Sequence, residues 1–142
     1  MTPRPTGDGD RRTREEAPLV LLVDDFEDAR EMYADHLEAS GFRTEQAADG
    51  HDALAKARAL VPDVILMDLS LPGIDGWEVT RRLKRDLRMG EVVILALTAH
   101  AFRGEEERAL AAGCDGFIPK PCLPQAVVER IRQELAARRG SR

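Results

Sequence analysis

The chain has 142 residues, of which 43% are hydrophobic and 33% charged, a composition typical of one soluble globular domain. Its formal charge of -5 argues against a nucleic-acid backbone as the partner. No run approaches the ~20 apolar residues that span a bilayer, and no signal-peptide stretch precedes Leu19. We therefore expect a cytoplasmic protein that binds neither nucleic acid nor a membrane.

The two ends of the chain differ from its middle. Residues 1–18 contain three prolines and almost nothing to bury, which predicts a flexible tail. One domain is expected over 19–137, followed by a short tail at 138–142. The basic cluster near the C-terminus is interpreted as a solvated helix end that complements the helix dipole; it consists of Arg138, Arg139 and Arg142.

The first structural unit begins at residue 19. Leu19–Val23 is a continuous apolar run that ends in Asp24 and Asp25, as expected for a strand covered on both faces. Glu27–Ser40 is predicted to be a helix, and Gly41 follows it as a C-cap. Its buried face is predicted from apolar residues four positions apart, which are Ala29, Tyr33 and Leu37.

Four more units of the same kind follow. The second strand has a polar centre and the weakest pattern. In chain order, the further strands are predicted at Phe42–Ala47, Val64–Met67, Val92–Leu97 and Gly116–Lys120. The helix after Gly50 stops at Pro62, and its inward positions are Ala53, Leu54, Ala57 and Leu60. The remaining helices are predicted at Trp77–Leu87, at Glu105–Ala112 and around the stripe of Val128, Ile131 and Leu135.

Strands that alternate with helices predict an α/β fold, in which a parallel sheet carries helices on both faces. Ligands bind such sheets outside the carboxyl ends of the strands. The polar residues at those ends should therefore meet, although they are far apart in the sequence: Asp24, Asp25, Asp68, Thr98 and Lys120.

This set of side chains suits phosphoryl chemistry. Carboxylates brought together repel one another, and Mg²⁺ would relieve the repulsion while leaving room for a phosphate oxygen. Asp68 is the candidate nucleophile. Asp25 would hold the metal, with Asp24 acting through water, and the backbone carbonyl of Ser70 would complete the coordination. Two donors remain for the phosphoryl oxygens, Lys120 and Thr98.

Four short segments occur in a specific order and spacing: Leu22–Asp25, Met67–Gly76, Leu97–Ala99 and Ile118–Pro121. Together they resemble the receiver domain of two-component response regulators, similar to the chemotaxis protein CheY. The resemblance covers about Leu19 to Leu135. It implies a flavodoxin-like fold, a doubly wound sheet of five parallel strands in the order 2-1-3-4-5 with five helices.

The resemblance also assigns roles within the site. Asp68 would be the phosphoacceptor, Lys120 the lysine that contacts the phosphate, and Thr98 the switch hydroxyl. Phe117 would be the switch aromatic ring, and the peptide bond between Lys120 and Pro121 would be cis. The metal-site acids would be Asp24 and Asp25.

The implied function is a phosphorylation-dependent signalling switch. A sensor histidine kinase or a histidine phosphotransfer protein would donate the phosphoryl group in a Mg²⁺-dependent reaction. A separate output protein would bind the face formed by the fourth helix, fifth strand and fifth helix. Such a protein is not an enzyme beyond catalysing its own phosphorylation and slow dephosphorylation. Ser70 and His100 stand where the family varies and where the phosphate lifetime is partly set.

Two other functions fit parts of the pattern. A binding module could keep the fold without using phosphate, although it would be expected to lack the acidic pair, Thr98 or Lys120. A phosphatase of the haloacid-dehalogenase type would need a second aspartate two residues after the first, where this chain has Ser70.

Cys114 and Cys122 flank the last predicted strand and should lie about 20 Å apart, too far for a disulfide.

Overall fold

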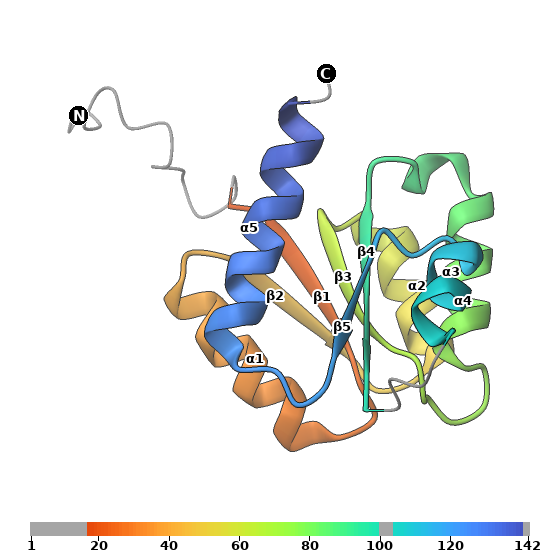
Figure 1. The fold of residues 1–142 in the computed structure, drawn as a ribbon, viewed down its shortest axis with the longest axis horizontal. Helices are drawn as coiled ribbons and strands as arrows, with labels where there is room; N and C mark the ends of the chain where they lie inside the picture. The colour runs from red at the N-terminus through yellow and green to blue at the C-terminus, as the bar shows by residue number, and fades with distance from the viewer. Residues whose placement is uncertain (1–16, 100–103, 141–142) are drawn as a thin grey trace.

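The computed structural model describes residues 17–99 and 104–140, and its centre is a sheet of five strands in the order β2-β1-β3-β4-β5 (Figure 1). The strands are β1 (Leu19–Val23), β2 (Arg43–Ala47), β3 (Val64–Asp68), β4 (Val93–Thr98) and β5 (Gly116–Pro119). All neighbouring strands pair in parallel. The predicted fold class and strand order are confirmed.

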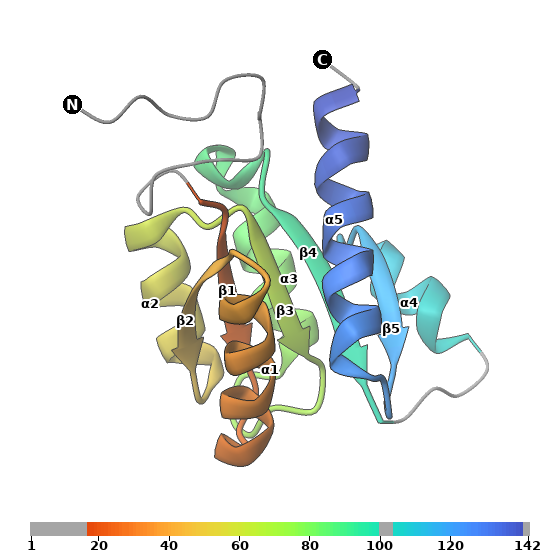
Figure 2. The same cartoon turned by 90° about the vertical axis from the view of Figure 1, so that its left-hand side faces the viewer.

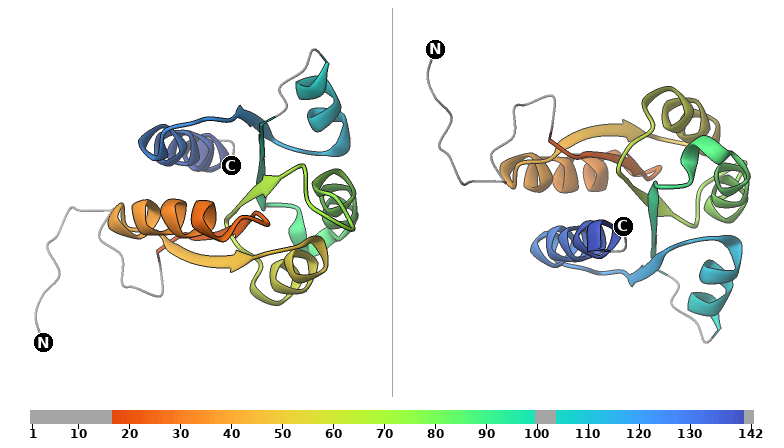
Figure 3. Two further views of the ribbon diagram at one scale, coloured as in Figure 1. Left: turned by 90° about the horizontal axis from the view of Figure 1, so that it is seen from below. Right: turned by 90° about the horizontal axis from the view of Figure 1, so that it is seen from above.

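Among the described residues, five α-helices cover the two faces of the sheet (Figure 2, Figure 3). They are α1 (Glu27–Ala39), α2 (Gly50–Leu60), α3 (Gly76–Arg85), α4 (Glu105–Ala112) and α5 (Pro124–Gly140). Helices α1 and α5 lie on one face, and α2, α3 and α4 on the other. Each face buries its own hydrophobic cluster, so the sheet is doubly wound. None of the described helices combines the length and apolar composition needed to cross a membrane.

The central strands form because both of their faces are apolar. β1, β3 and β4 are buried along their whole length. Alternate residues of β1 enter different clusters, with Leu21 on the face of α2 and Leu22 on the face of α1. The edge strand β2 buries only Ala47 fully, which accounts for the polar centre seen in its sequence.

Two predicted helix ends differ from the observed ones. Leu60 was expected to point inward, but it is 42% exposed. Helix α2 ends at this residue, and Val61, with φ of 45°, turns the chain away. Helix α3 ends at Arg85, before the predicted Leu87, whose side chain is 95% exposed. A 3₁₀-helix, η2 (Leu87–Met89), follows and buries Met89 instead.

Parts of the two predicted tails fall within the described residues. Residues 1–16 lie outside the described residues. Ala17 and Pro18 contact β2, since their carbonyl oxygens accept hydrogen bonds from Nε and N of Arg43, both at 2.9 Å. Helix α5 continues past the expected domain end at 137 as far as Gly140.

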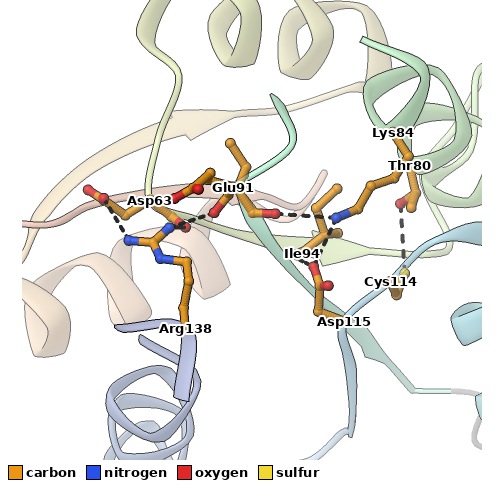
Figure 4. A network of polar contacts seen from close by, with 9 residues as sticks. Asp63, Thr80, Lys84, Glu91, Ile94, Cys114, Asp115 and Arg138 are labelled. Atoms are coloured by element: carbon orange, nitrogen blue, oxygen red, sulfur yellow. Dashed lines mark hydrogen bonds and ion pairs between the residues drawn. The ribbon is translucent and has the colours of Figure 1, made fainter. Parts of the chain in front are cut away.

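Arg138 is not the solvated helix end predicted from the sequence. Its Nη1 donates to the carbonyl oxygen of Glu91 at 2.6 Å, and its Nη2 lies 3.3 Å from Oδ1 of Asp63 (Figure 4). The other oxygen of Asp63 accepts the N–H of Leu19 at 2.8 Å. These contacts join the end of α5 to the segments that enter β1, β3 and β4.

A second polar network lies at the same amino-terminal edge of the sheet (Figure 4). Oδ2 of Asp115, just before β5, accepts from Lys84 at 3.1 Å and from the N–H of Ile94 at 2.8 Å. Thr80 Oγ1 lies 3.8 Å from the sulfur of Cys114. Both cysteines are free thiols, as expected from the long predicted distance between them. Cys114 is buried and Cys122 is half-buried.

Candidate functional site

The polar residues predicted at the strand ends lie along one edge of the sheet. Asp68 and Thr98 are the last residues of β3 and β4, Asp24 directly follows β1, and Lys120 directly follows β5. The carboxyl ends of these strands lie together in the lower part of Figure 1. This is the edge at which doubly wound sheets bind ligands.

Asp24, Asp25 and Asp68 form an acidic cluster. Each offers a carboxylate oxygen, and the three oxygens lie within 4.8 Å of one another. Asp24 and Asp68 are each only 6% exposed, whereas Asp25 is open to solvent. In the part of the chain that the structure describes, no other group of three acidic, histidine or cysteine side chains is arranged to share an ion. Carboxylate oxygens in this arrangement fit a hard divalent cation such as Mg²⁺.

Asp24 is held from several directions. Its Oδ1 accepts the N–H of Phe26, and its Oδ2 accepts from Nζ of Lys120, both at 2.9 Å. Its backbone carbonyl accepts from Nη1 of Arg30 at 2.7 Å. Each carboxylate oxygen therefore accepts one hydrogen bond, and the ammonium group offsets one of the two buried negative charges.

Asp68 keeps one carboxylate oxygen available. Its Oδ1 accepts the N–H of Ser70 at 2.9 Å, while no described residue donates to its Oδ2. Burial raises the pKa of Asp68, the charges of Asp24 and Asp25 raise it further, and the Ser70 hydrogen bond and Lys120 oppose the rise. One carboxylate oxygen of Asp68 lies within 4.8 Å of an oxygen of each of the other two acids.

The loop that follows Asp68 packs back against its own strand. A Cβ atom at Gly76 would lie 2.8 Å from Cα of Leu69 and closer still to the carbonyl oxygen of Asp68, so only glycine fits here. Asp75 then caps α3 by accepting the N–H of Glu78 at 3.0 Å. These contacts fix the backbone beside the candidate nucleophile.

Lys120 is a cation at neutral pH. Burial lowers its pKa, but the hydrogen bond and charge of Asp24, together with the charge of Asp68, outweigh burial and leave the pKa raised. Its N–H donates to the carbonyl oxygen of Thr98 at 2.7 Å, which ties the end of β5 to the end of β4. The peptide bond between Lys120 and Pro121 is cis, as the resemblance implies.

The predicted switch residues lie on neighbouring strands, Thr98 at the end of β4 and Phe117 within β5. Thr98 is fully buried, and its hydroxyl donates to Oε1 of Glu105 in the first turn of α4, at 3.1 Å. Phe117 is half-buried and packs against the hydrophobic cluster on the face of α2, α3 and α4. Ser70 is exposed beside Asp68, and a metal contact of its carbonyl stays a prediction. His100 lies outside the described residues.

Two residues that contact the site did not emerge from the sequence. Arg30 and Glu105 each sit in the first turn of a helix, where a charged side chain is normally expected to face water. Their contacts with Asp24 and Thr98 depend on how the helices pack, which residue spacing does not show. For Arg30, the one available signal was the polar centre of β2, whose Gln46 is its partner.

Comparison with known proteins identifies the class to which this fold belongs. The family model for the response regulator receiver domain matches residues 20–132. Over 116 residues the chain is 40% identical to the polar-differentiation response regulator DivK of Brucella ovis, covering 82% of this chain and 94% of DivK. The chain belongs to the response regulator receiver domain family.

Solved structures of similar fold come from the same group of proteins. Chemotaxis protein CheY4 of Vibrio cholerae is 31% identical with a TM-score of 0.78, covering 82% of this chain and 98% of CheY4. A CheY-like receiver domain protein from Methanospirillum hungatei is 28% identical with a TM-score of 0.83, covering 89% of this chain and 100% of that protein. The likeness extends over nearly all of both relatives.

Proposed function

We propose that the chain is a phosphorylation-dependent switch in which Asp68 accepts a phosphoryl group from a histidine kinase or a histidine phosphotransfer protein. The observation that carries this proposal is the buried carboxylate of Asp68, which belongs to the acidic cluster and is subject to the charge of Lys120, and to whose Oδ2 no described residue donates. Burial of Asp68 removes competing water from one side of the nucleophile. Membership of the receiver family supports the same reaction.

In the proposed transfer, Oδ2 of Asp68 attacks the phosphorus atom of phosphohistidine and a P–O bond forms. The P–N bond breaks, and its electron pair leaves with the imidazole of the donor, giving an acyl phosphate on Asp68. Lys120 and Thr98 would donate to the phosphoryl oxygens. Asp25, Asp68 and the backbone carbonyl of Ser70 would hold Mg²⁺, and Asp24 would contact it through water. The cation would offset the charge on the transferring group.

The proposed output is a change in the surface formed by α4, β5 and α5. Thr98 would move its hydroxyl from Glu105 toward the phosphoryl group, and Phe117 would turn inward. A groove of about 410 Å³ lies between β5 and α5, and Phe117, Ile118 and Cys122 are among the residues that line it. Inward movement of Phe117 would therefore change a wall of this groove, and phosphorylation would shift the population between two surfaces.

The proposed switch is cytoplasmic and turns over no external substrate. It would catalyse its own phosphorylation and slow dephosphorylation only, and a separate output protein would bind the changed surface. Membership of the response regulator receiver domain family supports an output partner for this surface.

The test is intact-mass measurement after incubation with acetyl phosphate and Mg²⁺. The wild-type chain should gain one phosphoryl group, while Asp68→Asn and wild type with EDTA should gain none. Asp75→Asn is the matched control, because Asp75 lies in the same loop but serves to cap α3. A phosphoryl adduct that persists in Asp68→Asn, or none on wild type with Mg²⁺, would overturn the assignment.

A further inference from the structure

The polar centre of β2 has a structural partner near the acidic cluster. Gln46 pairs with Leu22 in the parallel register and therefore shares its face, the one covered by α1. The half-buried side chain of Gln46 accepts a hydrogen bond through Oε1 from Nε of Arg30 at 3.1 Å. Its backbone carbonyl accepts from Nζ of Lys56. The glutamine thus fixes one side of the Arg30 guanidinium.

The other side of the guanidinium holds the loop that carries the metal-site acids. Nη1 of Arg30 donates to the carbonyl oxygen of Asp24 at 2.7 Å. Because the guanidinium is planar and rigid, its bonds to Gln46 and Asp24 together fix the loop relative to β2. The N–H of Asp24 donates to the carbonyl oxygen of Ala47 at 3.1 Å, so β2 holds both peptide units next to Asp24.

Asp25 depends on this support more than its neighbours do. Its carboxylate is exposed, and no side chain among the described residues bonds to it, whereas Asp24 and Asp68 are held by hydrogen bonds to their carboxylates. The carbonyl of Asp24 lies in the same rigid plane as the N–H of Asp25. Holding that carbonyl therefore limits where N and Cα of Asp25 lie, and with them the positions that the Asp25 side chain can reach.

We propose that Arg30, oriented by Gln46, is a positioning residue for the Mg²⁺ site. It holds the peptide between Asp24 and Asp25 so that the Asp25 carboxylate stays near that of Asp68. The inference rests on the proposed function only in taking Mg²⁺ as the cation, and it does not depend on phosphoryl transfer.

The test is calorimetric titration of Mg²⁺ alone into the full chain. Arg30→Ala should weaken Mg²⁺ binding by about tenfold, as expected for a residue that orients a metal ligand. Gln46→Ala should weaken it by a smaller factor although no charge is removed, and Arg30→Lys should fall between Arg30→Ala and wild type. Arg82→Ala is the matched control, because it removes the same charge from the exposed face of α3, where Arg82 pairs with Glu78.

Repeating the titrations at high salt separates position from charge. At ~1 M salt the Debye length is only ~3 Å, so a loss caused by misplacement of Asp25 should remain, and a loss caused by missing charge should disappear. Urea unfolding checks that each variant is folded; if Arg30→Ala is not, the Gln46→Ala titration decides the question.

Two results would overturn the inference. One is Mg²⁺ affinity within twofold of wild type in both Arg30→Ala and Gln46→Ala. The other is an Arg30→Ala loss that vanishes at high salt while Gln46→Ala matches wild type. Failure of the wild-type chain to bind Mg²⁺ would have a different meaning, because it would overturn the proposed metal site itself and the inference with it.

Discussion

Two buried aspartates of the same site differ in what surrounds each carboxylate. Both oxygens of Asp24 accept hydrogen bonds, one of them from the Lys120 ammonium. Among the described residues, a donor reaches only one oxygen of Asp68, and burial together with its acidic neighbours raises its pKa. The surroundings, rather than the residue type, thus leave Asp68 as the carboxylate with an oxygen available for reaction.

The two cysteines provide a test of local environment. Cys114 is 5% exposed, and burial raises the pKa of its thiol, while Cys122 is half-buried at the edge of the groove. Because the thiolate is the reactive form, a thiol reagent at pH 8 should modify one thiol in the folded chain and both after unfolding. Absorbance from Ellman's reagent measures this.

The raised pKa of the Cys114 thiol also predicts how this group's contribution to the free energy of unfolding changes with pH. The folded chain favours the neutral thiol, so the thiol's stabilising contribution is complete below the unfolded pKa of about 8.5. It is lost as the pH rises through the folded value.

Cys122→Ser is the control for the thiol-reagent measurement and should leave no fast-reacting thiol in the folded state. Rapid modification of both thiols in the folded wild-type chain would contradict the prediction.

At the scale of elements, the sequence predicted those features that depend on local pattern. Apolar runs located β1, β3 and β4 because these strands are buried on both faces. The predicted end of α3 at Leu87 was wrong, because Leu87 is apolar but lies beyond the last turn that packs on the sheet. The strand-end acids were found because parallel strands bring their ends together. Arg30 and Glu105 were missed because helix packing, not spacing, selects their partners.

Helix α4 begins with a carboxylate that holds the buried hydroxyl of Thr98. If Thr98 turns toward a phosphoryl group on Asp68, this contact exists only in the unphosphorylated state. Glu105→Ala should therefore favour the phosphorylated state by about 1 kcal/mol. The acetyl phosphate concentration for half-maximal phosphorylation should fall about fivefold, measured by intact mass.

Glu107→Ala is the matched control for this change. Glu107 carries the same charge in the same helical turn, and its side chain is exposed. It should leave the half-maximal concentration unchanged. Equal shifts in both variants would show that charge near the site, rather than the contact with Thr98, governs the response.

At the scale of the whole molecule, the two edges of the sheet carry different polar networks. The carboxyl edge gathers acids that repel one another, which suits ligand binding more than stability. The amino edge instead pairs opposite charges, through Arg138 with Asp63 and Lys84 with Asp115. Because the sheet separates the two edges, stability and phosphoryl chemistry should respond to different substitutions.

Arg138→Ala tests this separation. The side chain is 22% exposed and bonds to both Asp63 and the carbonyl of Glu91, so its removal leaves acceptors at the edge of the sheet without this donor. The free energy of unfolding in urea should fall by about 1–2 kcal/mol. Phosphorylation of Asp68 by acetyl phosphate should stay as in wild type.

Arg81→Ala is the control, because it removes an exposed pair with Glu78, and it should lower the free energy of unfolding by under about 1 kcal/mol. A phosphorylation defect in Arg138→Ala with unchanged stability would show that the two edges are coupled, because the substitution would then act on the site without weakening the fold.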